Sequence, residues 1–167
     1  MLMALAGIDS AVPVYTQEYV ALIVQRAKTE GNATEGRRIY EQSSCLACHA
    51  VGGSGGKIGP DLSALGRGLP IDMIVTEVVW PALNVKEGYE AATVTMKDGT
   101  VVTGFKQTET ADIIAIRDMT SGEMKTIKRT EAAQIQTGGT VMADGLTATM
   151  SEQQLAHLIR YLSELGN

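Results

Sequence analysis

The sequence has few aromatic residues, few cysteines and histidines, and no long hydrophobic run. Aromatic residues make up 4% of its 167 residues, with one Trp and one Phe. No apolar stretch approaches the length of a membrane span, so the sequence predicts no transmembrane segment. It holds only two Cys and two His. A structural zinc site needs four Cys or His ligands, so it would have to use every Cys and every His of this chain.

Basic residues are also outnumbered. The chain has 14 Lys and Arg against 19 Asp and Glu, a formal net charge of −5. This balance argues against a nucleic-acid-binding protein and favours a basic or neutral partner surface. A hydrophobic content of 44% and a charged content of 20% are typical of globular proteins. The length suits one domain, or one domain carrying an insertion.

One short motif is present: Cys45-Leu46-Ala47-Cys48-His49. Two thiols three positions apart, followed by a histidine, match the attachment site of c-type haem. Each thiol adds across one haem vinyl group, and His49 then falls beneath the ring as the proximal iron ligand. A redox dithiol is the alternative, but it expects a preceding strand and a βαβ pattern, and neither is visible. The motif therefore predicts one haem c, covalently bound through Cys45 and Cys48, which leaves no cysteine for a disulfide.

Thioether attachment of haem takes place on the exported side of bacterial membranes. The haem prediction therefore implies a periplasmic or otherwise exported protein. The opening stretch, residues 1–7, is apolar but short and lacks a basic region, so it is not a complete signal peptide. We expect a targeting segment or an upstream domain to precede this sequence.

Hydrophobic periodicity predicts helices on both sides of the motif. Residues 1–15 show no sustained period and are predicted to form a flexible arm. The Gly-rich stretch 52–56 is predicted to be a flexible loop. Ser151 and Gln154 form a capping-box pattern before the last helix. The predicted helices run from Thr16 to about Glu30, from Thr34 towards Cys45, from Pro70 to Trp80, and from Ser151 to Gly166.

From about Ala91 the hydrophobic period changes from 3.6 to 2, which is typical of strands. Asp98-Gly99 is a strong signal for a tight hairpin. A small antiparallel sheet or barrel is expected, ending at Gly138-Gly139. Because helices flank it, the sheet is predicted to be an insertion at about 91–136 in a domain covering 16–167. The fold class is therefore α+β, a mainly helical core with an inserted sheet. The expected strands are Thr93–Met96, Val101–Phe105, Ile113–Arg117, Met124–Lys128 and one containing Ile135.

This order of elements resembles a class I cytochrome c. More narrowly, it resembles the haem-binding domain of the planctomycete and verrucomicrobial type, whose mark is a β segment between the central helix and the ligand methionine. The resemblance runs from about Asn32 to Leu165. The family usually places Pro after the ligand Met, where this chain has Ala143. The matching stretches are Gly36-Arg37-Arg38-Ile39-Tyr40, Cys45–His49, Gly59-Pro60-Asp61-Leu62, Pro81 to Gly88-Tyr89, Lys97-Asp98-Gly99, and Met142-Ala143-Asp144-Gly145-Leu146.

The resemblance implies roles for individual residues. Pro60 resembles the proline whose carbonyl receives the Nδ1–H of His49 and orients the ring; a plain turn proline is the alternative. Arg67 resembles the arginine that pairs with a haem propionate; an exposed loop arginine is the other interpretation. Tyr89 is expected to line the propionate edge. Met142 is expected to be the sixth ligand of the iron.

Other residues compete for these roles. Met150 is the main rival to Met142, but it directly precedes the Ser151 cap, where a core residue is expected. His157 could give bis-His ligation, although an exposed or rim histidine is the favoured interpretation. Trp80 could also line the propionate edge, but it is more typical of core. Gly36, Tyr40 and Tyr161 resemble the contact where the first and last helices of a cytochrome c cross.

Taken with the resemblance, the motif predicts a one-electron carrier and not an enzyme. Redox proteins that dock weakly are its expected partners. Relatives are often fused or adjacent to secreted dehydrogenase-like domains, which makes such an enzyme a candidate donor. Two alternatives stay open: a haem-containing sensing or docking module whose β insertion binds a partner, and a peroxidase-like enzyme with a labile sixth ligand.

Overall fold

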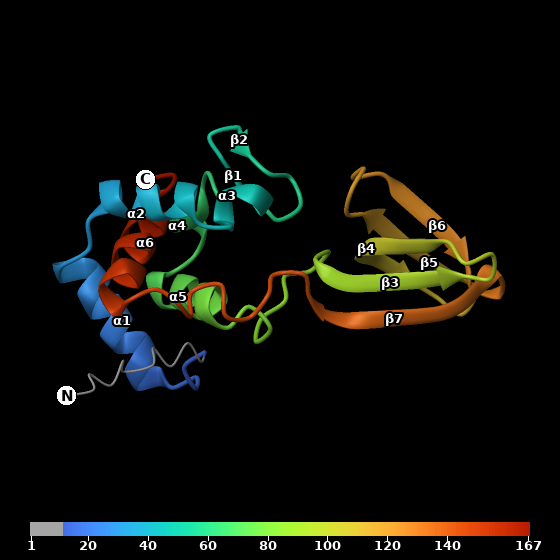
Figure 1. Cartoon of the computed structure of the whole chain (residues 1–167), viewed down its shortest axis with the longest axis horizontal. Coiled ribbons are helices and arrows are strands. Elements are labelled where there is room, and N and C mark those ends of the chain that lie inside the picture. The colour runs from blue at the N-terminus through green and yellow to red at the C-terminus, as the bar shows by residue number, and fades with distance from the viewer. Residues whose placement is uncertain (1–11) are drawn as a thin grey trace, which may run out of the picture. The chain divides into compact units, whose positions relative to one another are not determined.

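The computed structural model describes residues 12–167 (Figure 1), so most of the predicted arm at 1–15 lies outside the described residues. Six helices and a five-strand antiparallel sheet confirm the predicted α+β fold class. The helices are α1 (Gln17–Thr29), α2 (Ala33–Gln42), α3 (Cys45–Cys48), α4 (Leu65–Gly68), α5 (Ile71–Val79) and α6 (Glu152–Glu164). The strands are β1 (Ala50–Val51), β2 (Ser54–Gly55), β3 (Glu90–Met96), β4 (Val101–Glu109), β5 (Ile113–Asp118), β6 (Met124–Lys128) and β7 (Ala132–Thr140).

The chain forms two compact units. The first contains the described residues up to Cys45, together with Ala64–Trp80 and Asp144–Asn167. The second contains Leu46–Ser63 and Pro81–Ala143. In the described part of the chain, no helix combines the length and the apolar character needed to cross a membrane. The predicted division into an arm and a domain with an insertion at about 91–136 stays a prediction.

In the first unit, α6 packs against α1, α2, α4 and α5. Apolar residues at helical spacing build this core, as the periodicity predicts. Burying them removes apolar surface from water, which is the main favourable term in folding. The buried residues on these helices include Ile23 and Ala27 of α1, Ile39 and Tyr40 of α2, Ile74, Val75 and Val79 of α5, and Leu155, Leu158, Ile159 and Leu162 of α6.

Side-chain caps define where the helices begin. The Thr16 hydroxyl accepts from the Tyr19 N–H at 3.1 Å, and Ser151 and Gln154 form the predicted capping box. The second helix begins earlier than Thr34, because the Asn32 side chain accepts from the Glu35 N–H at 3.1 Å and so caps it. Asn is among the preferred N-cap residues, so that sequence signal was available.

The predicted crossing of α2 and α6 is confirmed. A Cβ atom on Gly36 would overlap the carbonyl oxygen of His157 and lie 2.7 Å from Cβ of Tyr161. The rings of Tyr40 and Tyr161 lie beside this contact, with centroids 5.7 Å apart. The glycine therefore lets the two backbones approach closely.

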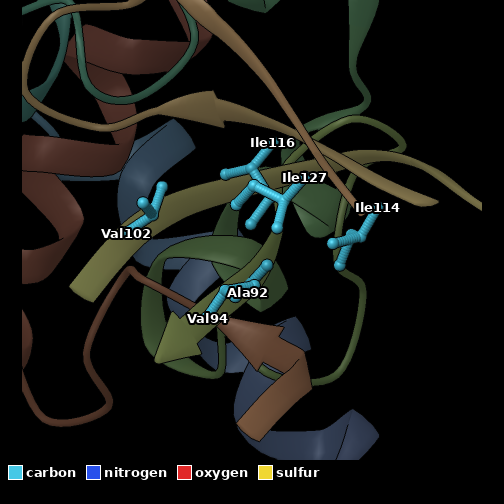
Figure 2. Close-up of a cluster of buried hydrophobic side chains, with 6 residues drawn as sticks. All are labelled: Ala92, Val94, Val102, Ile114, Ile116 and Ile127. Atoms are coloured by element: carbon cyan, nitrogen blue, oxygen red, sulfur yellow. The ribbon is translucent and has the colours of Figure 1, made fainter. Parts of the chain in front are cut away.

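The main sheet of the second unit has the strand order β6-β5-β4-β3-β7, and every pairing is antiparallel. One apolar face carries the core of this sheet (Figure 2), formed by β-branched residues and one alanine. A short 3₁₀ turn at Arg129–Glu131 joins β6 to β7. The buried cluster comprises Ala92, Val94, Val102, Ile114, Ile116 and Ile127.

Two expectations about glycine segments were wrong. The stretch 52–56 is not a flexible loop but part of a hairpin, in which Ala50 pairs with Gly55 and Val51 with Ser54. Gly52 and Gly53 have φ of 60° and 80°, the positive values that a tight two-residue hairpin turn requires. Likewise the sheet does not end at Gly138-Gly139, because β7 continues to Thr140, which pairs with Glu90.

Candidate functional site

The motif at 45–49 folds as one turn of helix followed by its histidine. The turn, α3, has Cys45 and Cys48 at its ends. Residues three positions apart share one face of a helix, so the turn presents its two thiols together. Both cysteines are half-buried and neither is in a disulfide. His49 is half-buried as well.

Two glycine amides that follow β2 hold this turn. The Gly56 N–H donates to the Leu46 carbonyl at 2.9 Å, and the Gly59 N–H donates to the Cys48 carbonyl at 2.8 Å. A Cβ atom at Gly56 would lie 2.9 Å from Cα of Cys48 and overlap the Ala47 backbone. The last carbonyl groups of a helix otherwise lack partners, so these bonds complete the turn.

The next part of the chain is tied back in the same way. The Gly52 N–H donates to the Ser63 hydroxyl at 2.8 Å, and the Leu62 N–H donates to the Ala50 carbonyl at 2.8 Å. Hydrogen bonds from Ser63 lower the pKa of Asp61; the bond from its side chain has the larger effect and the bond from its backbone the smaller. The segment that follows the motif is thus closed by its own hydrogen bonds.

The His49 ring is oriented by Pro60 and flanked by Gly59. Nδ1 of His49 lies 2.8 Å from the Pro60 carbonyl oxygen. A carbonyl can only accept, so Nδ1 carries a proton and Nε2 is the nitrogen left to act as a ligand. A Cβ atom on Gly59 would lie 2.5 Å from Cε1 of this ring, which leaves no room for a side chain. The sequence analysis did not predict this close approach of Gly59 to the His49 ring. The one available signal was the position of Gly59 directly before Pro60.

The two candidate methionine ligands lie in different units. Met142 follows β7 in the second unit, half-buried, and its N–H donates to the Thr140 hydroxyl at 3.1 Å. Met150 belongs to the first unit and lines a hollow of about 360 Å³ with Ile39 and Gln154. His49 lies in the same unit as Met142. The assignment of Met142 as the sixth ligand stays a prediction.

The structure gives Arg67 and Trp80 partners within the first unit. The Arg67 guanidinium donates to the Gly166 carbonyl. Trp80 is 7% exposed, and its Nε1 donates to the Pro13 carbonyl at 2.6 Å. Its ring also meets Tyr15 edge-on, with centroids 5.1 Å apart. Trp80 is therefore core, the favoured interpretation; the propionate role of Arg67 stays a prediction.

Tyr89 lies just before β3 and is held by two residues of the sheet. Its ring meets Phe105 edge-on at 5.2 Å between centroids, and the Arg117 guanidinium carbon lies 4.9 Å from its centroid. Sequence reasoning placed Tyr89 near a propionate but missed Phe105 and Arg117. Their pairing depends on the register of β4 and β5, which the sequence does not reveal.

His157 takes part in the helix packing of the first unit. Its Nδ1 accepts the Asn32 N–H at 3.0 Å, so this nitrogen carries a lone pair and no proton. Gln153 lies next to the other ring nitrogen, at 3.3 Å between the two Nε2 atoms. His157 is half-buried and bonded within the helix packing, whereas the favoured interpretation was an exposed or rim histidine. The alternative of bis-His ligation stays untested.

These residues fit a haem attached through sulfur. Cys45 and Cys48 lie on one helical turn, and the bond to Pro60 leaves Nε2 of His49 as the nitrogen that would bind iron. The hydrogen bond to Pro60 is the kind of contact that orients a metal-binding histidine. Gly59 itself adds no side chain against the imidazole, where a Cβ atom would lie 2.5 Å from Cε1.

Comparisons with known proteins agree with this fit. A family model described as cytochrome c matches residues 33–166, most of the chain. Over 39 residues, 23% of this chain, the sequence is 47% identical to the cytochrome c oxidase subunit 2 of Alkalihalophilus pseudofirmus. That match covers 11% of the length of the oxidase subunit.

Proposed function

Because this chain belongs to the cytochrome c family, we propose that it carries single electrons on one haem c held by Cys45, Cys48, His49 and Met142. A haem-containing electron carrier is what the family implies; these four residues are our assignment of its attachment and its axial ligands. The observation that carries the assignment is the bond of 2.8 Å between His49 Nδ1 and the Pro60 carbonyl, directly after the C-x-x-C turn.

An iron bound by imidazole and thioether supplies a one-electron couple of raised potential. The chain's own residues prepare that site. Pro60 holds the His49 ring and makes it a better donor, since a hydrogen bond on Nδ1 raises the basicity of the other nitrogen. Gly56 and Gly59 hold the carbonyl groups of the cysteine turn. Thr140 accepts the N–H of Met142, which anchors the backbone of the proposed sixth ligand.

We further propose the narrower family placement. The antiparallel sheet lies between α5 and Met142, the position that marks the planctomycete and verrucomicrobial type. With that placement go an exported location and weakly docking redox partners, among them a secreted dehydrogenase-like donor. Family members of this kind are typically not enzymes.

Absorption spectroscopy of purified, correctly matured protein tests the proposal. We expect low-spin spectra in both oxidation states, full reversibility on reduction, and haem that stays with the polypeptide in acidified organic solvent. A Cys45→Ser, Cys48→Ser double variant should release its pigment to that solvent. Colourless wild-type protein, or wild-type pigment that is extracted, would overturn the proposed function.

A further inference from the structure

One arginine of the sheet lies against two aromatic rings that also contact each other. The Arg117 guanidinium carbon lies 4.6 Å over the Phe105 centroid and 4.9 Å over the Tyr89 centroid. Nζ of Lys86 lies 6.0 Å from the same Tyr89 centroid. Cations within about 6 Å of an aromatic face are attracted by its quadrupole. Two positive charges are therefore gathered at one tyrosine.

The strand register fixes this arginine in place. Arg117 on β5 pairs with Phe105 on β4, and Met124 on β6 pairs with Arg117 on its other side. Phe105 is 2% exposed, so the ring beneath the guanidinium is buried. An aromatic ring face offers no lone pair of the kind that a carboxylate oxygen does, so these ring contacts leave the guanidinium N–H donors available for such an acceptor.

Most other basic residues of the sheet are neutralised within it. Lys106 lies 2.7 Å from Glu90, Lys125 lies 2.6 Å from Asp118, and Arg129 lies 2.8 Å from Glu109. Lys128 reaches Glu131 at 4.0 Å. Among residues 12–167, by contrast, Arg117 and Lys86 have no carboxylate partner. Their charges are thus left for a ligand outside the sheet.

We propose that Arg117, with Lys86 as a second positive charge, forms a carboxylate-binding site at Tyr89. The guanidinium fork matches a carboxylate in a bidentate manner, and ring contacts reduce the freedom that binding would otherwise cost. Lys86 acts through its field, because it lies well within a Debye length of that ring. Glu87 is adjacent to Lys86 and lines the neighbouring hollow of about 330 Å³. Arg117 and Lys86 against Glu87 leave one net positive charge. This balance suits a singly charged carboxylate better than a multiply charged phosphate.

The carboxylate has two sources that share this chemistry. The first is a haem propionate of the same molecule, and this source rests on the proposed function. The second is a small carboxylate from solution, for which acetate serves as the probe. The two sources make different predictions, so one set of variants separates them.

The variants are Arg117→Met, Arg117→Lys and Lys86→Gln in the full haem-bearing chain. Methionine keeps apolar bulk over the rings without the charge, while lysine keeps the charge without the fork. Arg129→Met is the matched control, because Arg129 is half-buried on the same segment but already paired with Glu109. Thermal unfolding of each variant reports its folding separately.

The first measurement is the midpoint potential across a pH series. If a propionate is bound, Arg117→Met lowers the potential, because the propionate charge is no longer balanced and favours the ferric state. Arg117→Lys should lower it less, Lys86→Gln should also lower it less, and Arg129→Met should leave it unchanged. Equal shifts in Arg117→Met and Arg129→Met would count against the propionate source. The loss of any positive charge from the sheet would then explain the fall in midpoint potential.

The second measurement follows the Nε–Hε resonance of Arg117 by NMR as acetate is added to ferrous protein, with chloride at matched ionic strength as the control. A saturable shift of this resonance with acetate, and none with chloride, supports the solution source. In Arg117→Lys, the signals of the new lysine should show no saturable shift with acetate. Folded variants that show neither the specific fall in potential nor acetate binding overturn the inference and leave electron transfer untouched. Protein without haem would contradict the proposed function instead, and the acetate titration would still decide this inference.

Discussion

The backbone N–H of Asn32 donates to Nδ1 of His157 across 3.0 Å, although the two residues are 125 positions apart in the sequence. Asn32 also caps α2 with its side chain, so the start of α2 is joined to the middle of α6. The bond requires the Nδ1 lone pair, which an imidazolium does not have. His157 thus has a structural role at the helix crossing.

Replacing His157 by Ala should weaken folding without changing the haem spectrum. The variant loses one hydrogen bond, worth about 0.5–1.5 kcal/mol. Denaturant unfolding measures the loss, and absorption spectra of both oxidation states measure the iron environment. A change of axial ligand in the spectra would favour bis-His ligation and contradict the structural role.

Gly36→Ala should destabilise the protein by about 1–3 kcal/mol, because the added methyl group overlaps the His157 carbonyl and α2 must move away from α6. Gly68→Ala is the matched control. Nothing lies within 4 Å of a Cβ there, and alanine is the better helix former. Thermal unfolding of the two variants decides the matter, and equal melting temperatures would show that the crossing tolerates a side chain.

Met142→Ala should abolish the methionine–iron charge-transfer band of the oxidised protein and lower the midpoint potential, since the thioether raises it. Met150→Ala removes a half-buried apolar side chain of the first unit and should keep the band. The pair of spectra identifies the ligand. A band that survives in Met142→Ala and disappears in Met150→Ala would reverse the assignment.

Gly59→Ala should displace the imidazole of His49, the proposed proximal ligand. The new methyl group would lie 2.5 Å from Cε1 of His49, too close for the ring to stay where Pro60 holds it. We expect less haem retained per polypeptide and a partly high-spin ferric spectrum. The control is again Gly68→Ala, and wild-type spectra for Gly59→Ala would show that the imidazole does not need this space.

Asp118 should make the sheet sensitive to acid. The Lys125 ammonium at 2.6 Å and the donors of Ser121 and Thr120 hold the pKa of this carboxyl well below its usual range. Because an unfolded Asp titrates near about 3.9, the ionised carboxylate stabilises the native state above that pH and the contribution is lost as the pH falls.

The matching variant is Asp118→Asn, with melting temperature followed from about pH 6 down to about pH 2. It should unfold at a lower temperature than wild type at neutral pH, and the difference should shrink as acid is added. Parallel curves at all values of pH would mean that the carboxylate charge contributes nothing to folding.

The helices were predictable because their signals are local. Thr16, Ser151 and the apolar stripes act within one or two turns, so the sequence shows them directly. The hairpin at 50–55 was missed because its strands are two residues each, too short for any alternation to appear. The structure reveals the turn through the pairing of Ala50 with Gly55 and the positive φ of Gly52 and Gly53.

The sequence predicted the cysteine motif and, through the family resemblance, the contact of Pro60 with His49, but not the other supports of the candidate site. The cysteines and His49 form a contiguous motif, whereas Gly59, Phe105 and Arg117 act through register and close approach. Asn32 illustrates the same limit: its cap follows from its neighbours, while its bond to His157 depends on how two distant helices cross.

The chain enters and leaves the five-strand sheet at the same place, because Glu90 at the start of β3 is paired with Thr140 at the end of β7. Because the two ends of this inserted sheet lie side by side, the insertion adds almost no loop-closure entropy cost to the folding of the chain on either side. A gene could therefore gain, lose or exchange the stretch in a single event and still place Met142 just after the junction. The strands between these paired ends could then change in sequence or length without moving the backbone that leads to Met142, the proposed ligand.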